Sequence, residues 1–309
     1  MNQPLPLLFS IRSYQYLKEA IAAHGGFENG NVEVKIFPDG ERYQRVATPV
    51  AGREVILIGG TCSDAETLEL YDLSYALVKY GAARFILVIP YFGYSTMERA
   101  SKAGDVVTAK TRARLLSSIP QAAGGNLLVL LDLHSEGLPH YFEGELTPVH
   151  LYSHSLILKT ISQIAKSDYV LGCTDAGRAK WVQSLAIDAG TFASFVFKRR
   201  IDDRHTEVYA ISGQVSGKQV IIYDDMIRTG CSLINAAKAY KNAGAADICV
   251  ITTHGIFAGD ALKRLKETGL ISKIICTDSH PNVIKIDDEF LEIKSVAELF
   301  ANYLKTNLR

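Results

Sequence analysis

The feature that most constrains the fold is an alternation of short apolar runs with longer amphipathic segments. The runs EVILIGG, RFILVIPYFG, NLLVLLDLH, YVLGCTDAG, QVIIYDD and DICVITTHG are rich in Val, Ile and Leu. Continuous apolar strands are typical of parallel sheets covered by helices on both faces. The intervening segments are predicted to be those helices, and SLINAAKAYKNAGA is expected to have Ser232 as its N-cap. The sequence therefore predicts an α/β protein with mostly parallel sheets flanked by helices.

The length of 309 residues is sufficient for two domains. The predicted strands form two sets that look alike, one before and one after about residue 150. We expect an N-terminal domain over residues 1–150 and a C-terminal domain over residues 151–309. The last segment, residues 295–309, reads as an amphipathic helix that can pack on either half.

Composition argues against several classes of protein. Thirty-three basic and thirty-three acidic residues give no net charge, which disfavours a nucleic-acid-binding or membrane-surface protein. The chain has no apolar stretch of about 18 residues and no signal-peptide pattern, so neither a membrane span nor export is expected. The five cysteines are scattered without metal-binding spacing, which indicates reduced thiols in a cytoplasmic protein.

Polar residues at the predicted strand ends are candidate functional positions, because ligands of open α/β sheets lie beyond the carboxyl ends of strands. These ends supply Asp132, His134, Asp175, Asp224, Asp225 and His254.

The stretch YDDMIRTGCS, residues 223–232, carries the most information. A turn of small residues that opens a helix points several backbone N–H groups in one direction, which favours a phosphate. The carboxylates of Asp224 and Asp225 would repel that phosphate, so we expect them to face sugar hydroxyls or a metal ion. A strand that simply ends in an Asp pair and a tight turn is the alternative. The loop residues expected to hold the phosphate end are Arg228, Thr229, Gly230, Cys231 and Ser232.

This stretch resembles the loop that binds phosphoribosyl pyrophosphate (PRPP) in type I phosphoribosyltransferases and in ribose-phosphate pyrophosphokinases, the PRPP synthetases. The rest of the chain resembles the synthetases in five ordered segments: FPDGERYQRV, PYFGYSTMERASKAGDVVTAKTRARLLSSI, DLHSEGLPHYF, FKRR and TTHGIF. The ERxxxxGDVVTA spacing and SSIPQAAGG are similar to the plant-type, phosphate-independent branch. The resemblance implies two similar domains of the type I phosphoribosyltransferase fold.

The resemblance also implies an enzyme, a diphosphokinase-type transferase. It would move the β,γ-diphosphoryl group of ATP to the anomeric hydroxyl of ribose 5-phosphate, giving PRPP and AMP. Mg²⁺ would be the cofactor, held by His134 and Asp175 directly or through water. Lys198 and Arg200 would stabilise charge on the transferring group. The family further implies a homodimer or larger homo-oligomer.

The same resemblance implies that ATP lies near Asp39, Glu41, Arg99 and His134. The residues alone allow plainer interpretations. FPDGER would be read as a turn, FKRR as a solvated basic run, and His134 as a hydrogen-bonded structural residue.

The chain departs from the family pattern near both substrates. Ser95–Arg99 replace an Arg-Gln-Asp-Arg run, Arg178 replaces a glycine, and Arg228 replaces an acidic residue of the loop. A charge pair about 4 Å apart near a surface is worth roughly 4 kcal/mol, so a reversed charge can redirect acceptor choice. The two added cations favour, as an alternative acceptor, a ribose 5′-diphosphate ester such as ADP-ribose, which would be a step of NAD salvage.

Two other classes of protein remain as alternatives. A non-catalytic, synthetase-like regulatory subunit would lose catalytic residues, whereas Lys198, Arg200, His134, Asp175 and both strand-end carboxylates are present here. A phosphoribosyltransferase shares the loop but usually has one such domain. The sequence therefore favours an enzyme of the synthetase type.

Overall fold

The chain forms two compact units. The computed structural model describes residues 4–200 and 206–308. Unit 1 comprises Met1–Tyr152 with Ala297–Arg309, and unit 2 comprises Ser153–Val296. The C-terminal helix, which the sequence could not assign to a half, therefore belongs to unit 1.

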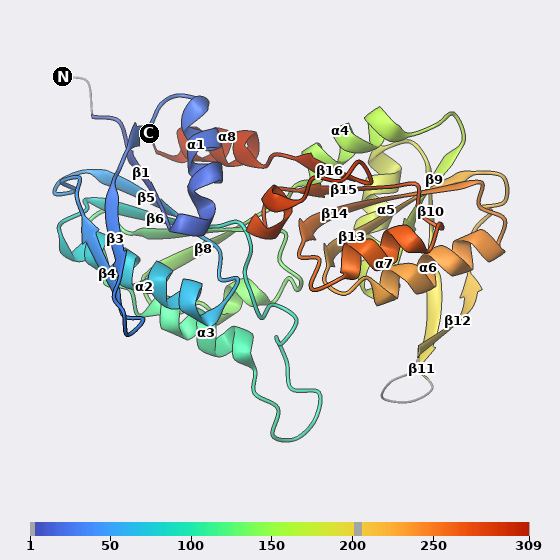
Figure 1. Ribbon diagram of the computed structural model, residues 1–309, viewed down its shortest axis with the longest axis horizontal. Coiled ribbons are helices and arrows are strands. Elements are labelled where there is room, and N and C mark those ends of the chain that lie inside the picture. Colours follow the sequence, from blue (N-terminus) through green and yellow to red (C-terminus); the bar gives the residue numbers. More distant parts are fainter. Residues whose placement is uncertain (1–3, 201–205, 309) are drawn as a thin grey trace. The chain divides into compact units, whose positions relative to one another are not determined.

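Unit 1 is built on a six-stranded parallel sheet with the strand order β2-β1-β5-β6-β7-β8 (Figure 1). Its strands are β1 (Leu7–Ser10), β2 (Glu28–Asn29), β3 (Val32–Ile36), β4 (Arg42–Val46), β5 (Glu54–Ile58), β6 (Arg84–Ile89), β7 (Asn126–Leu131) and β8 (Leu146–Leu151). Its helices are η1 (Arg12–Tyr14), α1 (Gln15–Ala23), α2 (Asp64–Lys79), α3 (Thr108–Ser117), η2 (Leu138–Tyr141) and α8 (Ala297–Asn307).

Unit 2 is built on a second six-stranded parallel sheet, ordered β10-β9-β13-β14-β15-β16. Its strands are β9 (Tyr169–Cys173), β10 (Phe192–Ser194), β11 (Val196–Arg200), β12 (Thr206–Ile211), β13 (Gln219–Ile227), β14 (Asp247–Gly255), β15 (Lys273–Thr277) and β16 (Leu291–Lys294). Its helices are α4 (His154–Ile164), η3 (Ala176–Arg178), α5 (Ala179–Asp188), α6 (Cys231–Asn242), α7 (Ala261–Glu267) and η4 (Pro281–Lys285).

The two units repeat one topology. In each sheet the second strand along the chain lies at the edge beside the first, and the remaining strands follow in sequence order. In each unit a two-stranded antiparallel pair, β3–β4 or β11–β12, is inserted before the third sheet strand. This arrangement confirms the predicted fold class of two similar, helix-flanked parallel sheets.

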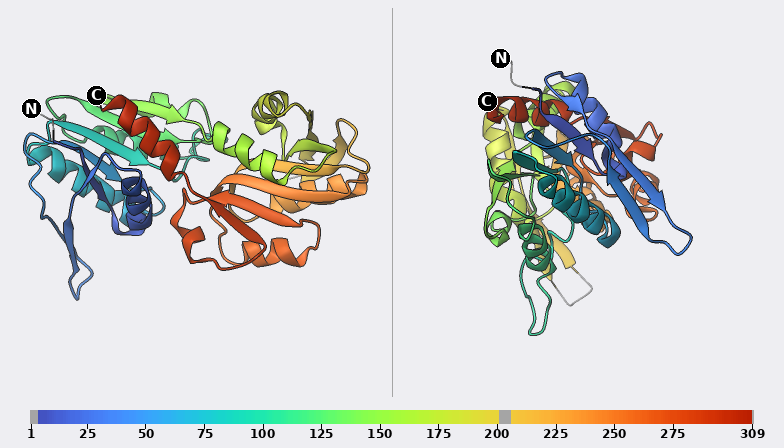
Figure 2. Two further views of the ribbon diagram at one scale, coloured as in Figure 1. Left: turned by 90° about the horizontal axis from the view of Figure 1, so that it is seen from above. Right: turned by 90° about the vertical axis from the view of Figure 1, so that its left-hand side faces the viewer.

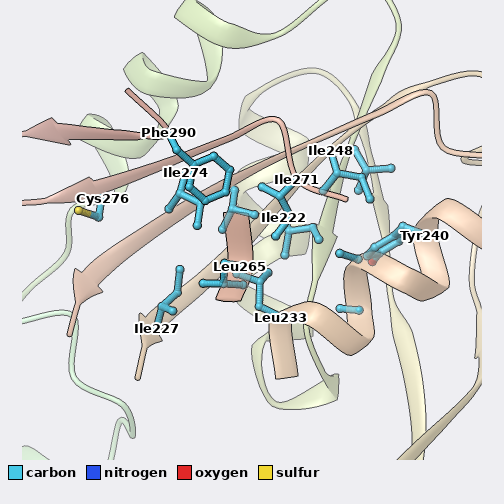
Figure 3. Packing of buried hydrophobic residues seen from close by; sticks show 14 of the residues in the cluster. Ile222, Ile227, Leu233, Tyr240, Ile248, Leu265, Ile271, Ile274, Cys276 and Phe290 are labelled. Carbon is cyan, nitrogen blue, oxygen red and sulfur yellow. The ribbon is translucent and has the colours of Figure 1, made fainter. Parts of the chain in front are cut away.

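The sheet of unit 2 is covered by apolar side chains on both faces. On one face Ile222 of β13 joins a buried cluster with Leu233 of α6 and Leu265 of α7 (Figure 3). On the other face Ile221 and Tyr223 join a cluster with residues of α4 and α5. Each fully buried side chain of this kind contributes about 1.5–3 kcal/mol, so the two clusters hold β13 firmly at the centre of the sheet.

Helix α8 completes unit 1 by packing beside α1, as Figures 1 and 2 both show. Its C-terminal end is tied to the sheet, because Arg84 Nη1 of β6 donates to the carbonyl oxygen of Asn307 at 2.9 Å. The side chains of Phe300 and Leu304 are fully buried. The chain thus returns to its first unit after the second is complete.

Two global expectations can be compared with the structure. Among the described residues, no helix combines the length and apolar character needed to cross a membrane. All five cysteines are free thiols.

The structure corrects two local predictions. Strand β13 does not end at Asp224 and Asp225 but continues to Ile227, because β14 also continues and pairs Ile227 with Gly255. Ser232 is not the N-cap of α6. The helix begins at Cys231 after Gly230, whose φ of 78° places the chain in the left-handed region just before the first turn.

Candidate functional site

The two carboxylates of β13 lie where the sheet loses one neighbour of that strand. Strand β9 pairs with β13 only as far as Cys173 opposite Tyr223, whereas β14 stays paired beyond it. Asp224 and Asp225 are therefore held by backbone hydrogen bonds to one side and face an open sheet edge on the other. The topology itself presents these side chains at the carboxyl end of the sheet, where ligands of such folds bind.

Asp224 is half-buried and oriented by two donors. Thr174 Oγ1 donates to its Oδ2 at 2.8 Å, and the backbone N–H of Asp225 donates to its Oδ1 at 3.0 Å. Burial raises the pKa of Asp224 well above its usual range, and the neighbouring charge of Asp225 raises it further. Each carboxylate oxygen keeps lone pairs for a further donor, such as a sugar hydroxyl.

Asp225 is almost completely buried, with 3% of its surface exposed, and is paired with Arg178. Nε of Arg178 donates to Oδ1 at 3.1 Å, and Nη2 lies 2.5 Å from Oδ2. Desolvation by itself lowers the pKa of Arg178, but the Asp225 carboxylate outweighs it and the net shift is upward. The sequence alone suggests Arg178 as an extra cation that would bind the acceptor. In the structure its charge is neutralised by Asp225.

The loop after β13 is anchored from two directions. The carbonyl oxygen of Ile227 accepts from the N–H groups of Ile256 and Phe257, and that of Arg228 accepts from Ala258 at 2.8 Å. Gly230 turns the chain into α6, and a Cβ there would lie 3.0 Å from Leu265. The first N–H groups of α6 have no acceptor within the helix, so this end of the helix favours an anion.

One cationic side chain belongs to this loop and another contacts its backbone. Arg228 is exposed, as are Thr229, Cys231 and Ser232. Arg264 of α7 donates through Nη2 to the carbonyl oxygen of Thr229 at 3.0 Å, a contact that no sequence pattern predicts. The loop therefore has, in addition to its own N–H groups, an arginine of its own and a second arginine from α7 that contacts its backbone.

The two residues expected to hold magnesium lie in different units. Asp175 of unit 2 is exposed, and its Oδ1 accepts from the N–H of Gly177 at 2.9 Å in the turn that precedes α5. His134 of unit 1 follows β7 in a loop where Asp132 adopts a φ of 38°. Within the part of the chain that the structure describes, no three His, Cys, Asp or Glu side chains gather in one metal-binding group.

The two inserted strand pairs carry the other expected site residues. Asp39 and Glu41 lie in the exposed turn between β3 and β4, where Asp39 Oδ1 accepts from the N–H of Glu41 at 3.1 Å. Lys198 and Arg200 lie in β11, opposite Val208 and Thr206 of β12, and their side chains fall outside the described residues. The pair β3–β4, predicted to contact the nucleotide, and the pair β11–β12, predicted to carry catalytic residues, thus occupy equivalent positions in the topologies of the two units.

Arg99 lies in the long loop between β6 and α3. Its side chain is 81% exposed, and its nearest charged contact is Glu98, with Nε 3.5 Å from Oε1. The surrounding loop is better fixed, because the hydroxyl of Tyr141 donates to the carbonyl oxygen of Glu98. Arg99 is therefore presented to solvent by an anchored loop.

The structure adds residues that the sequence did not single out. Thr174 is fully buried and orients Asp224, although it adjoins the expected ligand Asp175. Trp181 of α5 stacks on Tyr223, with ring centroids 4.3 Å apart and an interplanar angle of 15°. The position of Thr174 in GCTDAG was a usable signal, whereas the partner of Trp181 is 42 residues away in sequence and could be found only from the fold.

Two parallel sheets of one topology, with a carboxylate pair and a helix-opening loop at a strand end, define the type I phosphoribosyltransferase-like fold class. The family model for the N-terminal domain of ribose phosphate pyrophosphokinase matches residues 6–119 of this sequence. The model of the phosphoribosyl synthetase-associated domain matches residues 197–305. The chain belongs to the ribose-phosphate pyrophosphokinase family.

Individual relatives agree over nearly the whole length. The ribose-phosphate pyrophosphokinase of Caldanaerobacter subterraneus is 34% identical over 298 residues, covering 95% of this chain and 92% of the relative. The chloroplastic ribose-phosphate pyrophosphokinase 1 of Oryza sativa is 33% identical over 302 residues, covering 94% of this chain and 73% of the relative. The crystal structure of phosphoribosylpyrophosphate synthetase from Mycobacterium smegmatis has a TM-score of 0.87 at 24% identity and covers 99% of both chains, which supports the fold.

Proposed function

We propose that this chain transfers the β,γ-diphosphoryl group of ATP to the anomeric hydroxyl of ribose 5-phosphate, giving PRPP and AMP. The observation that carries the proposal is the half-buried Asp224 carboxylate near the end of β13, the strand that leads into a loop whose helix end favours an anion. A carboxylate next to an anion-binding loop suits a sugar phosphate, whose hydroxyls would contact the carboxylate and whose phosphate would contact the loop. Relatives that cover most of the chain and are named ribose-phosphate pyrophosphokinases support the same reaction.

The acceptor is held, in this proposal, by the C-terminal end of β13. Arg228, Thr229, Gly230, Cys231 and Ser232 take its phosphate end through N–H groups and hydroxyls. Asp224 accepts hydrogen bonds from the ribose hydroxyls, and Asp225 is the second carboxylate of the pair. Phosphoryl transfer depends mainly on alignment and charge neutralisation, so a rigidly held acceptor accounts for a large part of the rate.

The donor and the transferring group are assigned to the remaining residues. Asp39, Glu41, Arg99 and His134 contact ATP, and Lys198 with Arg200 stabilise negative charge that develops on the diphosphoryl group. The active molecule is a homodimer or larger homo-oligomer, as the resemblance to the family implies. The scattered cysteines without metal-binding spacing support a cytoplasmic location.

Magnesium fits the donor set that this chain offers. The oxygen ligand Asp175 is exposed, and magnesium characteristically uses one or two carboxylates together with substrate phosphates rather than a closed protein cage. We assign Asp175 and His134 to the ion, directly or through water. When bound, the ion neutralises charge on the phosphates of ATP.

A second candidate acceptor is favoured by the charges beside the loop. Arg228 and Arg264 add two guanidinium groups to a loop that already offers backbone N–H groups. Guanidinium groups bind phosphate oxygens in a bidentate manner, so this end of the site suits a larger anion. A ribose 5′-diphosphate ester such as ADP-ribose presents the same anomeric hydroxyl and one additional phosphate.

The experiment that tests both candidates measures AMP release from ATP and magnesium with a single acceptor present. Ribose 5-phosphate and ADP-ribose are supplied in parallel, and Arg228→Asp is the variant compared with the native protein. AMP with ribose 5-phosphate alone supports the first candidate. AMP mainly with ADP-ribose, and a reversal of preference in Arg228→Asp, supports the second. AMP with neither acceptor, while both still bind, contradicts both and indicates a regulatory subunit.

A further inference from the structure

The two carboxylates of β13 lie in different environments because consecutive side chains of a strand point to opposite faces of the sheet. Ile221 and Tyr223 pack against α4 and α5, so Asp225 follows them onto that face. Ile222 packs against α6 and α7, so Asp224 lies on the face from which the loop enters α6. Only Asp224 therefore shares a face with the helix end assigned to the acceptor phosphate.

Asp224 and Asp225 also differ in their hydrogen-bond and ion-pair partners. Asp225 uses both oxygens on one guanidinium, that of Arg178, which is itself only 15% exposed in its side chain. Asp224 is more accessible and is oriented by a neutral hydroxyl and a backbone N–H. A buried carboxylate needs such a cation, and a planar guanidinium that binds through two parallel contacts also fixes its orientation.

We propose that Arg178, by pairing with Asp225, gives the two carboxylates different roles. Asp224 alone contacts the acceptor, and Asp225 is a positioning residue. Rigidly paired to the start of α5, Asp225 fixes the backbone of β13 at the residue whose N–H orients Asp224. The acceptor then meets one uncompensated carboxylate instead of two, which reduces the repulsion of its phosphate end. This inference rests on the proposed function, because it concerns the acceptor of that reaction.

The test is a double-mutant cycle on the KM for ribose 5-phosphate. Arg178→Met keeps the methylene stem without the charge, and Asp225→Asn keeps the shape of the carboxylate without its charge. Each single variant leaves one buried group without its partner, and we expect each to raise the acceptor KM about tenfold while the KM for ATP stays within about twofold. The double variant removes both groups and should return to within about threefold of the native value.

The matched control is Asp224→Asn, which should raise the acceptor KM more than about thirtyfold in every background, since it removes the contact itself. A double variant that binds acceptor no better than Asp225→Asn would overturn the proposal, because Asp225 would then contact the acceptor directly. Circular dichroism of each variant checks that it is folded.

If the native protein makes no PRPP, the proposed function fails by itself. Calorimetric binding of ribose 5-phosphate to the same four proteins then decides the role of Asp225 by the same comparison.

Discussion

Gly230 offers a sharp test of how the loop is built, because unit 2 contains a matched control. Gly230 and Gly217 have nearly equal φ values, 78° and 76°. A Cβ at Gly217 would meet no atom within 4 Å, whereas at Gly230 it would lie 3.0 Å from Cδ1 and Cγ of the fully buried Leu265. Gly217→Ala therefore reports backbone strain alone, and Gly230→Ala reports strain together with crowding.

The expected magnitudes follow from these contacts. A left-handed alanine costs about 1–2 kcal/mol, which is the whole loss expected for Gly217→Ala. Crowding a packed core adds about 1–3 kcal/mol, so Gly230→Ala should lose about 2–5 kcal/mol in urea unfolding. It should also raise the KM for ribose 5-phosphate, since the N–H groups that follow it change direction. Equal losses in the two variants, with an unchanged acceptor KM, would refute the account of the loop.

Three further predictions address acid stability, packing and the metal. Burial and the nearby His254 lower the pKa of His280 to about 4, below the value near 6.5 of an unfolded chain. As the pH falls, the unfolded state therefore binds this proton before the folded state does, and the unfolding free energy measured in urea titrations should fall by about 3 kcal/mol from pH 7 to pH 4. The His280→Asn variant should lack this loss. The exposed control His140→Asn should retain it. Gly93→Ala should give mostly insoluble protein in expression trials, because its Cβ would lie 2.0 Å from the carbonyl oxygen of Thr61. Chelation with EDTA should abolish AMP formation and leave the unfolding midpoint unchanged, since among the described residues no three-ligand metal group supports the fold.

Strand–helix periodicity was sufficient to predict the parallel sheets, because a strand buried on both faces must be apolar at every position. The alternation could not show how far β13 extends. Asp224 and Asp225 read as the end of the apolar run, yet the strand continues while β14 pairs with it. Likewise, the small residues at 230–232 indicated a helix start, but the N-cap depended on the backbone of Gly230 rather than on the hydroxyl of Ser232.

Side-chain partners distant in sequence explain most of what the sequence missed at the candidate site. The pair Arg178–Asp225 spans 47 residues, and Arg264 reaches the loop from 35 residues beyond Thr229. The residue types were visible, and Arg178 and Arg228 were recognised as departures from the family pattern. The fold was needed to show that Arg178 is neutralised, whereas Arg228 stays exposed beside the loop.

The measurement that tests the central claim most directly follows the phosphorus atoms of ATP by ³¹P NMR with ribose 5-phosphate and magnesium present. Transfer of an intact diphosphoryl group predicts that AMP and a sugar-linked diphosphate appear together in equal amounts, with no ADP and no free phosphate as primary products. The appearance of ADP with a sugar-linked monophosphate, or of hydrolysis products alone, would contradict the account.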